Sequence, residues 1–366
     1  MKPKDLELDH VTFINNGQKL ETKLNKDKPK KLYKYYSLNS YSIEGLVNST
    51  IYFSHVYLLN DIVDGELNLL WDFQNFLKNN KDDLKKIIPI PSESNEDRYI
   101  ERYIKNRTIP EFLESRGVLS LTSSYNNELL WTHYCNEKGF CLEIEISKFE
   151  EYLKKIKGNE NYQFFPVSYY SPLKQIDFDK YALITKEIGD FGAGLVERNS
   201  IDAKLPILYG LASKEKHWEY EEEWRVLLND AKFNSITHPL QIINDYQKEV
   251  ENDLKLAGNI KIERDVIGKI ILGPLFFNNE RFTEKIELAN SFIYIFKKNK
   301  EGELARFFLI TLEKNFHDKI YRVDKILKNK AITREITHVI KIIGIGNNYV
   351  KLSFLSINSD SKIREL

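Results

Sequence analysis

The most informative stretch of this chain is His217-Trp218-Glu219-Tyr220-Glu221-Glu222-Glu223-Trp224-Arg225, which runs into Val226-Leu227-Leu228. Its aromatic and β-branched residues, and the Asn229-Asp230 pair that follows, favour a short β-strand, although glutamates also suit a helix. Side chains of a strand alternate between its two faces, so Glu221, Glu223 and Arg225 would share one face. We therefore expect two carboxylates and a guanidinium on one surface.

Two interpretations of this surface differ in function. Charged side chains protect the edge strand of a sheet from pairing with another molecule, so the stretch can be an edge with no chemistry. The alternative is a catalytic Glu-x-Glu, with Glu221 and Glu223 as the working carboxylates. Two carboxylates on one strand face repel each other unless a cation lies nearby. We therefore expect Lys34 or Arg225 within hydrogen-bond reach of at least one of them.

Composition is that of an ordinary globular protein. The 366 residues are 42% hydrophobic and 30% charged, and 54 basic residues balance 54 acidic ones. The chain is long enough for a substantial core, and no global field attracts nucleic acid or an anionic membrane. Two cysteines, Cys135 and Cys141, do not make a disulfide framework. With no signal peptide and no apolar run of about 18 residues, we expect a cytoplasmic protein that does not span a membrane.

Charge runs and periodicity suggest three parts. We expect an N-terminal extension over residues 1–31, a main domain over 32–300, and a C-terminal extension over 301–366 with a β-hairpin around Gly346-Asn347-Asn348. Helices are expected over Leu67–Leu77, Glu128–Cys135 and Asn279–Ala289, and strands over Leu32–Tyr36, Gly117–Ser124, Gly139–Ile146 and Phe292–Phe296.

Several short blocks, taken in order, carry a family resemblance. They are Leu32-Tyr33-Lys34-Tyr35, Tyr52-Phe53-Ser54 with Asn60-Asp61, Leu119-Ser120-Leu121, Leu130-Trp131-Thr132-His133-Tyr134, Gly139-Phe140-Cys141-Leu142-Glu143, Lys216 to Arg225, and Ile270-Ile271-Leu272-Gly273-Pro274. Over roughly residues 32 to 296 the chain resembles the bacterial domain-of-unknown-function family 2971. The loop at Asn60-Asp61 departs from the family's Phe-Asn-Asp-Pro, because Leu59 precedes it and Ile62 follows it.

A more distant similarity suggests chemistry. A first strand with a polar residue between aromatics, a middle strand ending in Ser or Thr, and a late strand with Glu-x-Glu are similar to the three-part signature of the ADP-ribosyltransferase fold. That resemblance implies an α+β fold with a mixed or antiparallel central sheet and surrounding helices. It also implies NAD as a substrate, with a first-strand Arg or His at its phosphates or ribose. Here Lys34 stands at that position.

The resemblance gives each candidate residue a role. Glu223 would stabilise the positive charge that develops on the ribose, and Glu221 would orient or deprotonate an acceptor. Lys34 or Arg225 would hold the pyrophosphate. The resulting cofactor-binding set is Tyr33, Lys34, Tyr35, Tyr52, Ser54, Trp131, Tyr134 and Arg225. The expected partners are a small-molecule nucleotide and a protein or nucleic-acid acceptor, in the setting of a toxin or phage-defence effector.

Two other functions remain open. An aromatic cleft around Tyr35 and Trp131 can stack a base, so the chain can be a non-catalytic nucleotide-sensing or interaction module. Alternatively, Asp61, Asp64 and Glu66 supply oxygen atoms of the kind that magnesium prefers, as in a metal-dependent nuclease. We assign no metal ligands, because the histidines lack paired-ligand spacing.

Overall fold

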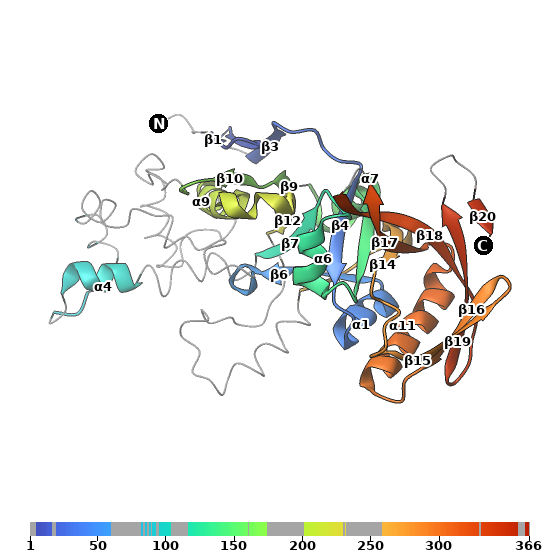
Figure 1. Cartoon of the computed structure of the whole chain (residues 1–366). Helices are drawn as coiled ribbons and strands as arrows, with labels where there is room; N and C mark the ends of the chain where they lie inside the picture. Colours follow the sequence, from blue (N-terminus) through green and yellow to red (C-terminus); the bar gives the residue numbers. More distant parts are fainter. Residues whose placement is uncertain are drawn as a thin grey trace. The chain divides into compact units, whose positions relative to one another are not determined.

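A computed structural model describes residues 5–16, 20–59, 82, 85, 88, 90–92, 95–103, 116–159, 161–173, 201–229, 231, 258–328, 331–357 and 363–365. The chain divides into two compact units, each made of separate segments (Figure 1). Unit 1 comprises Met1–Lys28, Tyr52–Ser120 and Leu153–Ile260, and unit 2 comprises Pro29–Ile51, Leu121–Tyr152 and Lys261–Leu366. The predicted loop at Asn60-Asp61 and helix at Leu67–Leu77 lie outside the described residues.

Unit 2 is built on a large, mostly antiparallel sheet with the strand order β15-β16-β19-β18-β17-β14-β8-β4. One neighbouring pair, β14 and β17, is parallel, so the sheet is mixed. Its strands are β4 (Lys31–Tyr36), β8 (Phe140–Glu145), β14 (Ile267–Leu272), β15 (Phe282–Leu288), β16 (Ser291–Phe296), β17 (Ile320–Lys328), β18 (Ala331–Ile345) and β19 (Tyr349–Ile357), and β20 (Ile363–Glu365) pairs with β19.

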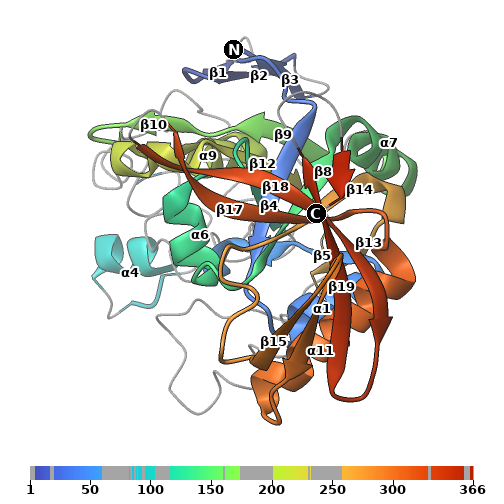
Figure 2. The same cartoon turned by 45° about the vertical axis from the view of Figure 1, so that its right-hand side comes forward.

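Unit 2 also contains helices. They are α1 (Ser40–Asn48), α6 (Glu128–Cys135) and α11 (Lys300–Phe316), and α7 (Ile146–Lys157) begins in unit 2 and ends in unit 1. Asparagine side chains cap three of them: Asn39 for α1, Asn127 for α6 and Asn299 for α11. The side-chain oxygen of each asparagine accepts a hydrogen bond from a backbone N–H in the first turn, which has no partner within the helix. Helices α1 and α11 lie side by side in both views (Figures 1 and 2).

Unit 1 contains a smaller set of strands. β12 (Glu223–Leu228) lies between β7 (Gly117–Thr122) and β9 (Tyr162–Pro166), and a parallel pair joins β10 (Ser168–Tyr170) to β11 (Ser213–Glu215). Helix α9 (Ile201–Ala212) leads directly into β11. The core of this unit includes Phe13, Phe165 and Leu208, all fully buried. The remaining elements of unit 1 are β1 (Leu6–Glu7), β2 (Val11–Asn15), β3 (Leu20–Leu24), β6 (Ser54–His55), η1 (Val56–Leu58), α4 (Glu96–Tyr103) and η4 (Lys216–Glu221). The 3-10 helix η6 (Arg264–Val266) belongs to unit 2, and β5 (Thr50–Tyr52) and β13 (Asn259–Lys261) each include residues of both units.

Much of the predicted secondary structure is confirmed. The protein is mixed α/β with a large, mostly antiparallel sheet, and helix α6 and strands β4, β7, β8 and β16 fall where the sequence predicts them. The C-terminal hairpin is also present as β18 and β19. It is not a separate appendage, because β18 pairs with β17 and β19 pairs with β16 in the main sheet.

Two predictions were wrong. Residues Lys216–Glu221 form a 3-10 helix and not the start of a strand, because Glu222 adopts a left-handed conformation (φ 43°) that separates this helix from β12. Residues 282–288 form strand β15 and not a helix, because the short turn at Ala289-Asn290 pairs them with β16. The N-terminal extension contains a three-stranded antiparallel sheet, β1-β2-β3, in which Val11 and Phe13 are fully buried.

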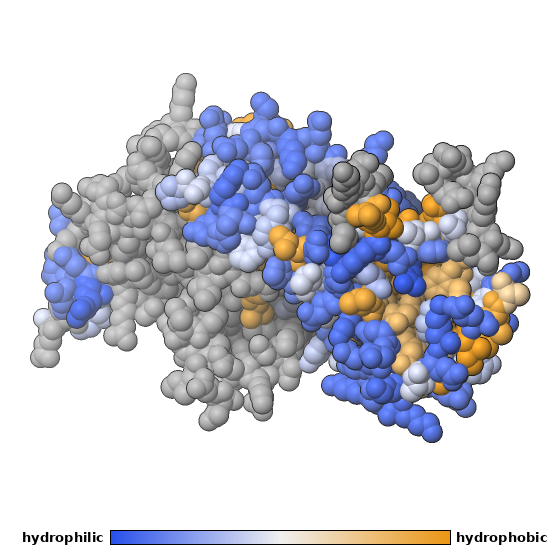
Figure 3. Space-filling view, viewed as in Figure 1, coloured by the Kyte–Doolittle hydropathy of each residue, from blue (hydrophilic) through white to orange (hydrophobic). Residues whose placement is uncertain are grey.

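The described surface is mainly hydrophilic, with some exposed apolar side chains (Figure 3). On β3 no residue is fully buried, and the described surface in Figure 3 is largely hydrophilic with smaller hydrophobic patches. Exposed apolar side chains in the strands of unit 2 include Leu327, Ile343 and Ile286. Among the residues that the model describes, no helix is both long and apolar enough to cross a membrane.

Candidate functional site

Four charged side chains of unit 1 form a buried group around the beginning of β12. Glu223 and Arg225 come from β12, Glu221 from the last residue of η4, and Lys214 from β11. The exposed fractions are 6% for Glu223, 4% for Glu221, 6% for Lys214 and 0% for Arg225. We call these four residues the Glu223 cluster. Ionised groups are rarely buried unless they are paired, and here two carboxylates face two cations.

The strongest contact joins Glu223 and Arg225. Arg225 donates from Nε to Oε1 of Glu223 at 2.7 Å and from Nη2 to Oε2 at 3.0 Å. Its third nitrogen, Nη1, donates to the carbonyl of Leu211 at 2.9 Å. The two-residue spacing on a strand puts both side chains on one face, as the sequence predicts. A bidentate pair of this kind fixes the position of the carboxylate and favours its ionised form.

Lys214 connects the two carboxylates. Its ammonium donates to Oε2 of Glu221 at 2.7 Å and to Oε2 of Glu223 at 3.3 Å. The same ammonium lies 4.8 Å from the centre of the Trp218 ring, on η4. The Trp218 Nε1 atom is buried, and no acceptor contacts it among the described residues. This buried donor beside the cluster therefore has no acceptor within the described segments of the chain.

Hydrogen bonds from neighbouring strands complete the surroundings of Glu223. Its backbone N–H donates to the hydroxyl of Tyr169 at 2.8 Å, and Tyr169 lies opposite Lys214 in the β10–β11 pair. The hydroxyl of Ser120, on β7, also contributes a hydrogen bond to the Glu223 carboxylate. Burial raises the pKa of Tyr169 well above its usual range, so its hydroxyl stays protonated.

The charge state of Glu223 follows from these contacts. Burial opposes the charged carboxylate, but the charges of Arg225 and Lys214 and the hydrogen bonds from Arg225 and Ser120 outweigh it, and the pKa is lowered to about 2. Glu223 is therefore an anion at neutral pH. It suits a fixed negative charge that stabilises a cation, and it does not suit a general acid.

Several predictions for the stretch around Glu223 can now be compared with the structure. A cation within reach of a carboxylate is confirmed by the Arg225–Glu223 contact. The edge-strand interpretation is wrong, because β12 has a neighbour on each side, β7 and β9. Trp224 is fully buried, as expected, whereas Tyr220 is only partly buried. Arg225 is occupied by Glu223 and Leu211, so its contacts assign it to positioning the carboxylate.

The remaining predicted residues are distributed over both units. Tyr33, Lys34 and Tyr35 belong to β4 in unit 2, where alternation places Lys34 on the face opposite the two tyrosines. The Lys34 ammonium lies 5.7 Å from the Tyr36 ring.

Trp131 and Tyr134 are also in unit 2, on α6. Trp131 is fully buried and packs edge-on against Tyr35, with ring centres 4.9 Å apart. The carbonyl of Tyr134 accepts a hydrogen bond from Ser37. Tyr52 and Ser54 belong to unit 1, where Ser54 pairs with Val118. The residues that contact Glu223 directly thus include one member of the predicted cofactor-binding set, Arg225.

A second buried carboxylate, Glu143, lies in unit 2. It is 1% exposed, and it accepts hydrogen bonds from Lys31 at 2.6 Å, Tyr33 at 3.1 Å and Lys269 at 3.2 Å. Lys31 also contacts Glu145 at 3.1 Å. Strand pairing explains the arrangement, because Tyr33 and Lys269 lie opposite Glu143 on either side. The tyrosine predicted to bind a cofactor is therefore engaged with a carboxylate.

Sequence patterns missed three residues of the site: Lys214, Tyr169 and Ser120. Lys214 and Tyr169 meet because β10 and β11 pair, although 42 residues of chain (171–212) lie between the end of β10 at Tyr170 and the beginning of β11 at Ser213. No local pattern announces such a pairing. The sequence does predict the hydroxyl-bearing strand that contains Ser120. It does not predict that Ser120 contacts Glu223.

The comparisons with known proteins give one match. Residues 130–226 match the family model described as "Protein of unknown function (DUF2971)". The match includes Trp131 and Tyr134 of α6, and also Glu221, Glu223 and Arg225. No curated protein and no solved structure matches the chain. The family description assigns no activity, so chemistry has to be argued from the residues.

Within the described part of the chain, no three His, Cys, Asp or Glu side chains gather in a way that would hold a metal ion. Asp61, Asp64 and Glu66, which suggested a nuclease, lie outside the described residues. The two cysteines are buried and unpaired with each other, and burial raises the pKa of both thiols.

Proposed function

We propose that this chain is an NAD-consuming enzyme of the ADP-ribosyltransferase or NAD glycohydrolase type, with Glu223 and Glu221 as its catalytic carboxylates. The observation that carries the proposal is the contact between Ser120 of β7 and Glu223 of β12. It joins β7, a strand that ends in the hydroxyl residue Thr122, to β12, which begins with Glu223, the second glutamate of the Glu-x-Glu. The ADP-ribosyltransferase signature likewise combines a strand that ends in Ser or Thr with a late Glu-x-Glu, and the serine assigned to NAD from the sequence was Ser54. A relationship to that fold is part of the proposal.

The charge state of Glu223 supports the assigned chemistry. Cleavage of the bond between nicotinamide and ribose leaves positive charge on the sugar, and a preorganised anion in a water-poor site stabilises that charge better than water does. Glu223 is buried and ionised, and the fork of Arg225 holds it in place. Glu221, linked to it through Lys214, is assigned to the acceptor.

Access to the carboxylates requires a local rearrangement in this proposal. Lys214 binds both glutamates, so NAD has to displace its ammonium from at least one of them. Trp218 on η4 packs against that ammonium, and its Nε1 donor, which meets no acceptor in the described part of the chain, is assigned to an oxygen atom of the substrate. We assign η4 as the cover of the site. NAD binding should then change the fluorescence of Trp218.

The test is release of nicotinamide from NAD by the purified chain. Glu223→Gln removes the charge and keeps the shape, and it should reduce the rate of release at least about a hundredfold while NAD still binds. Glu222→Gln is the matched control, because Glu222 is exposed and adjacent in sequence. Retention of full activity by Glu223→Gln would refute the assignment of Glu223.

A non-catalytic nucleotide-sensing or interaction module is the second candidate. One observation favours it: the two carboxylates of the Glu223 cluster are matched by two cations, which weakens the net field at the site. NAD binding without nicotinamide release, modification of an acceptor or any other turnover would support this second candidate over the enzyme.

A further inference from the structure

The large sheet of unit 2 ends at β15, and this edge strand is exposed. Among the strands that the structure describes, β15 pairs with β16 alone, and six of its seven residues are exposed. Its register with β16 is regular from Glu284 to Leu288, after a shift that follows Phe282. An edge strand carries unpaired backbone N–H and C=O groups, which a further strand can join.

The side chains of β15 divide into an apolar face and a charged face. Ile286 and Leu288 share one face, where Ile286 lies opposite Ile293 of β16. Their exposed fractions are 37% and 42%, so burial of this face would be favourable. Lys285 and Glu287 share the other face and form an ion pair at 2.6 Å. Their side chains are 44% and 69% exposed, so this pair contributes little to stability and can exchange its partners at little cost.

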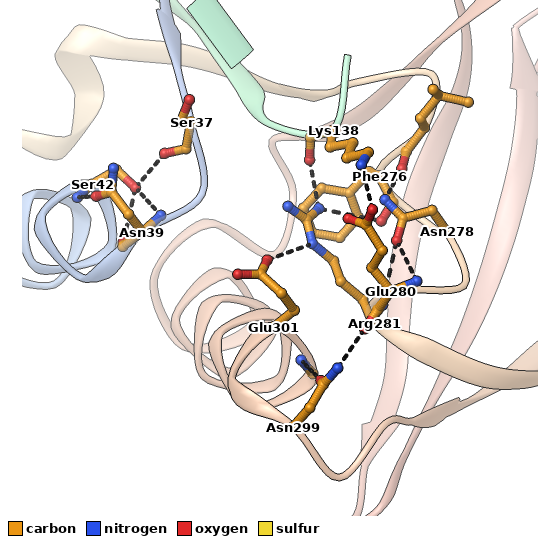
Figure 4. Close-up of polar contacts among 12 residues, drawn as sticks. Ser37, Asn39, Ser42, Lys138, Phe276, Asn278, Glu280, Arg281, Asn299 and Glu301 are labelled. Atoms are coloured by element: carbon orange, nitrogen blue, oxygen red, sulfur yellow. Dashed lines mark hydrogen bonds and ion pairs between the residues drawn. The ribbon is translucent and has the colours of Figure 1, made fainter. Parts of the chain in front are cut away.

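The residues just before β15 are held in place. Arg281, 3% exposed, donates from Nη1 to the carbonyls of Lys138 at 2.5 Å and Phe276 at 3.3 Å. The side-chain amide of Asn299, which caps α11, donates to the carbonyl of Glu280 at 3.1 Å. Figure 4 shows these contacts converging on the turn that leads into β15. An edge that is already fixed loses little entropy when a second strand joins it.

The order of side chains along β15 is self-complementary in one antiparallel register. A twofold axis at Ile286 places this residue opposite its own copy, and it places Lys285 opposite Glu287 of the second copy in both directions. The outer positions oppose Leu288 and Glu284, a pair without like charges. Opposite charges and apolar pairs stabilise two adjacent strands, whereas directly opposed like charges destabilise them.

Neighbouring registers are poorer. An axis at Lys285 opposes two lysines, and an axis at Glu287 opposes two glutamates. An axis moved half a residue toward Lys285 sets Glu284 against Glu287, and one moved half a residue toward Glu287 sets both apolar residues against charged ones. Charges on an edge strand usually prevent pairing with other molecules. On β15 their alternating signs disfavour the registers next to Ile286 and favour the one centred on it.

We propose that two copies of this chain associate through β15, antiparallel and with the twofold axis at Ile286, so that the sheet of unit 2 continues from one copy into the other. Ile286 and Leu288 of both copies then adjoin on one face, and two Lys285–Glu287 ion pairs join the copies on the other. A contact over five residues of each strand is smaller than a standard interface, so we expect a reversible dimer with a Kd on the order of 10 µM. The proposed NAD chemistry uses residues of unit 1 only, so this association is independent of it.

Sedimentation velocity of the full chain over about 1–200 µM tests the association. The wild type should pass from monomer to dimer within this range. Lys285→Glu and Glu287→Lys should each weaken the dimer at least about tenfold, because each sets two like-charged pairs opposite one another. Lys298→Glu is the matched control, because Lys298 is exposed and lies outside β15, and it should associate like the wild type. A wild type that stays monomeric, or a dimer that survives both charge reversals, would overturn the proposal.

Mixing the two variants separates this interface from a general effect of charge. In an equimolar mixture of Lys285→Glu and Glu287→Lys, one copy presents two carboxylates and the other two ammonium groups. The mixture should therefore form a dimer nearly as tight as that of the wild type, and the double variant with both reversals should associate within about threefold of it. Thermal melting should show that every variant is folded. A mixture that remains monomeric would refute the pairing of Lys285 with Glu287.

Cysteine cross-linking tests the register. With the axis at Ile286, the Cα atoms of the two copies of this residue lie about 4.5–5.5 Å apart, a separation that a disulfide can span. Ile286→Cys should form a covalent dimer on mild oxidation, whereas Leu288→Cys should not, because its two copies would lie about 13 Å apart. The native Cys135 and Cys141 are buried, so they leave the assay clear. Failure of Ile286→Cys to cross-link, or equal cross-linking of both variants, would overturn the register.

Discussion

Arg225 donates two parallel hydrogen bonds to the Glu223 carboxylate, of 2.7 Å and 3.0 Å, within unit 1. Both side chains are buried. These bonds keep the Glu223 carboxylate ionised and fix its orientation. In the proposed chemistry the carboxylate therefore reorganises little when positive charge develops on the ribose. The same contact makes stability depend on each member of the pair.

Removal of Arg225 should be strongly destabilising. Arg225→Met leaves Glu223 buried with Lys214 as its remaining cation, and the loss of one partner of a buried pair costs about 3–5 kcal/mol. Urea denaturation measures this change. Lys216→Ala is the control, because the Lys216–Glu219 pair is more than half exposed, and it should cost less than about 1 kcal/mol. Equal stabilities for the two variants would show that the fork contributes little.

Stability should fall in acid through Glu223. Its pKa of about 2 in the folded chain lies below the ordinary value of 4.5, so the unfolded chain binds the proton more readily. The carboxylate therefore contributes stability that is fully present above about pH 4.5 and is lost as the pH falls toward 2. Glu223→Gln should flatten the dependence of unfolding free energy on pH within this window, with Glu222→Gln measured in parallel. An unchanged slope would mean that the depressed pKa of Glu223 is not a source of acid sensitivity.

The strands that a reader of the sequence can find are those with strong local signals. β8 and β4 alternate or carry aromatic residues within clear boundaries, and α6 begins directly after a good capping residue, Asn127. The Glu223–Arg225 contact also follows from local spacing.

The surroundings of Glu223 could not be predicted in this way. Lys214 reaches the site because β11 pairs with β10, and Ser120 because β7 lies beside β12, and both are long-range events. The left-handed conformation of Glu222 could not be predicted either, since a glutamate gives no sequence signal for a positive φ. This conformation ends the 3-10 helix that stands where the first half of the strand was expected.

A glycine next to Glu143 provides a test of the second buried carboxylate. A Cβ atom at Gly268 would lie 2.8 Å from Oε1 of Glu143 and 2.8 Å from Oε1 of Glu145. Lys31, Tyr33 and Lys269 hold Glu143, so its side chain cannot move aside freely. Gly268→Ala should therefore destabilise the chain by about 1–3 kcal/mol in chemical denaturation.

The matched control for that substitution is Gly344→Ala. Gly344 is also a strand residue of unit 2, and a Cβ atom there meets nothing within 4 Å. Its stability should stay within about 0.5 kcal/mol of the wild type. If both alanine variants behave alike, the contacts around Glu143 are looser than the distances indicate.

The central claim is that the ionised Glu223 carboxylate works on NAD, and release of nicotinamide tests it most directly. The wild-type chain should release nicotinamide, alone or with a protein or nucleic-acid acceptor, and Glu223→Gln should reduce the rate by at least about a hundredfold, the usual effect of removing one preorganised electrostatic group. Glu222→Gln should retain the wild-type rate, and thermal melting should show that all three proteins are folded. A wild-type chain that neither binds NAD nor releases nicotinamide under any of these conditions would contradict the account.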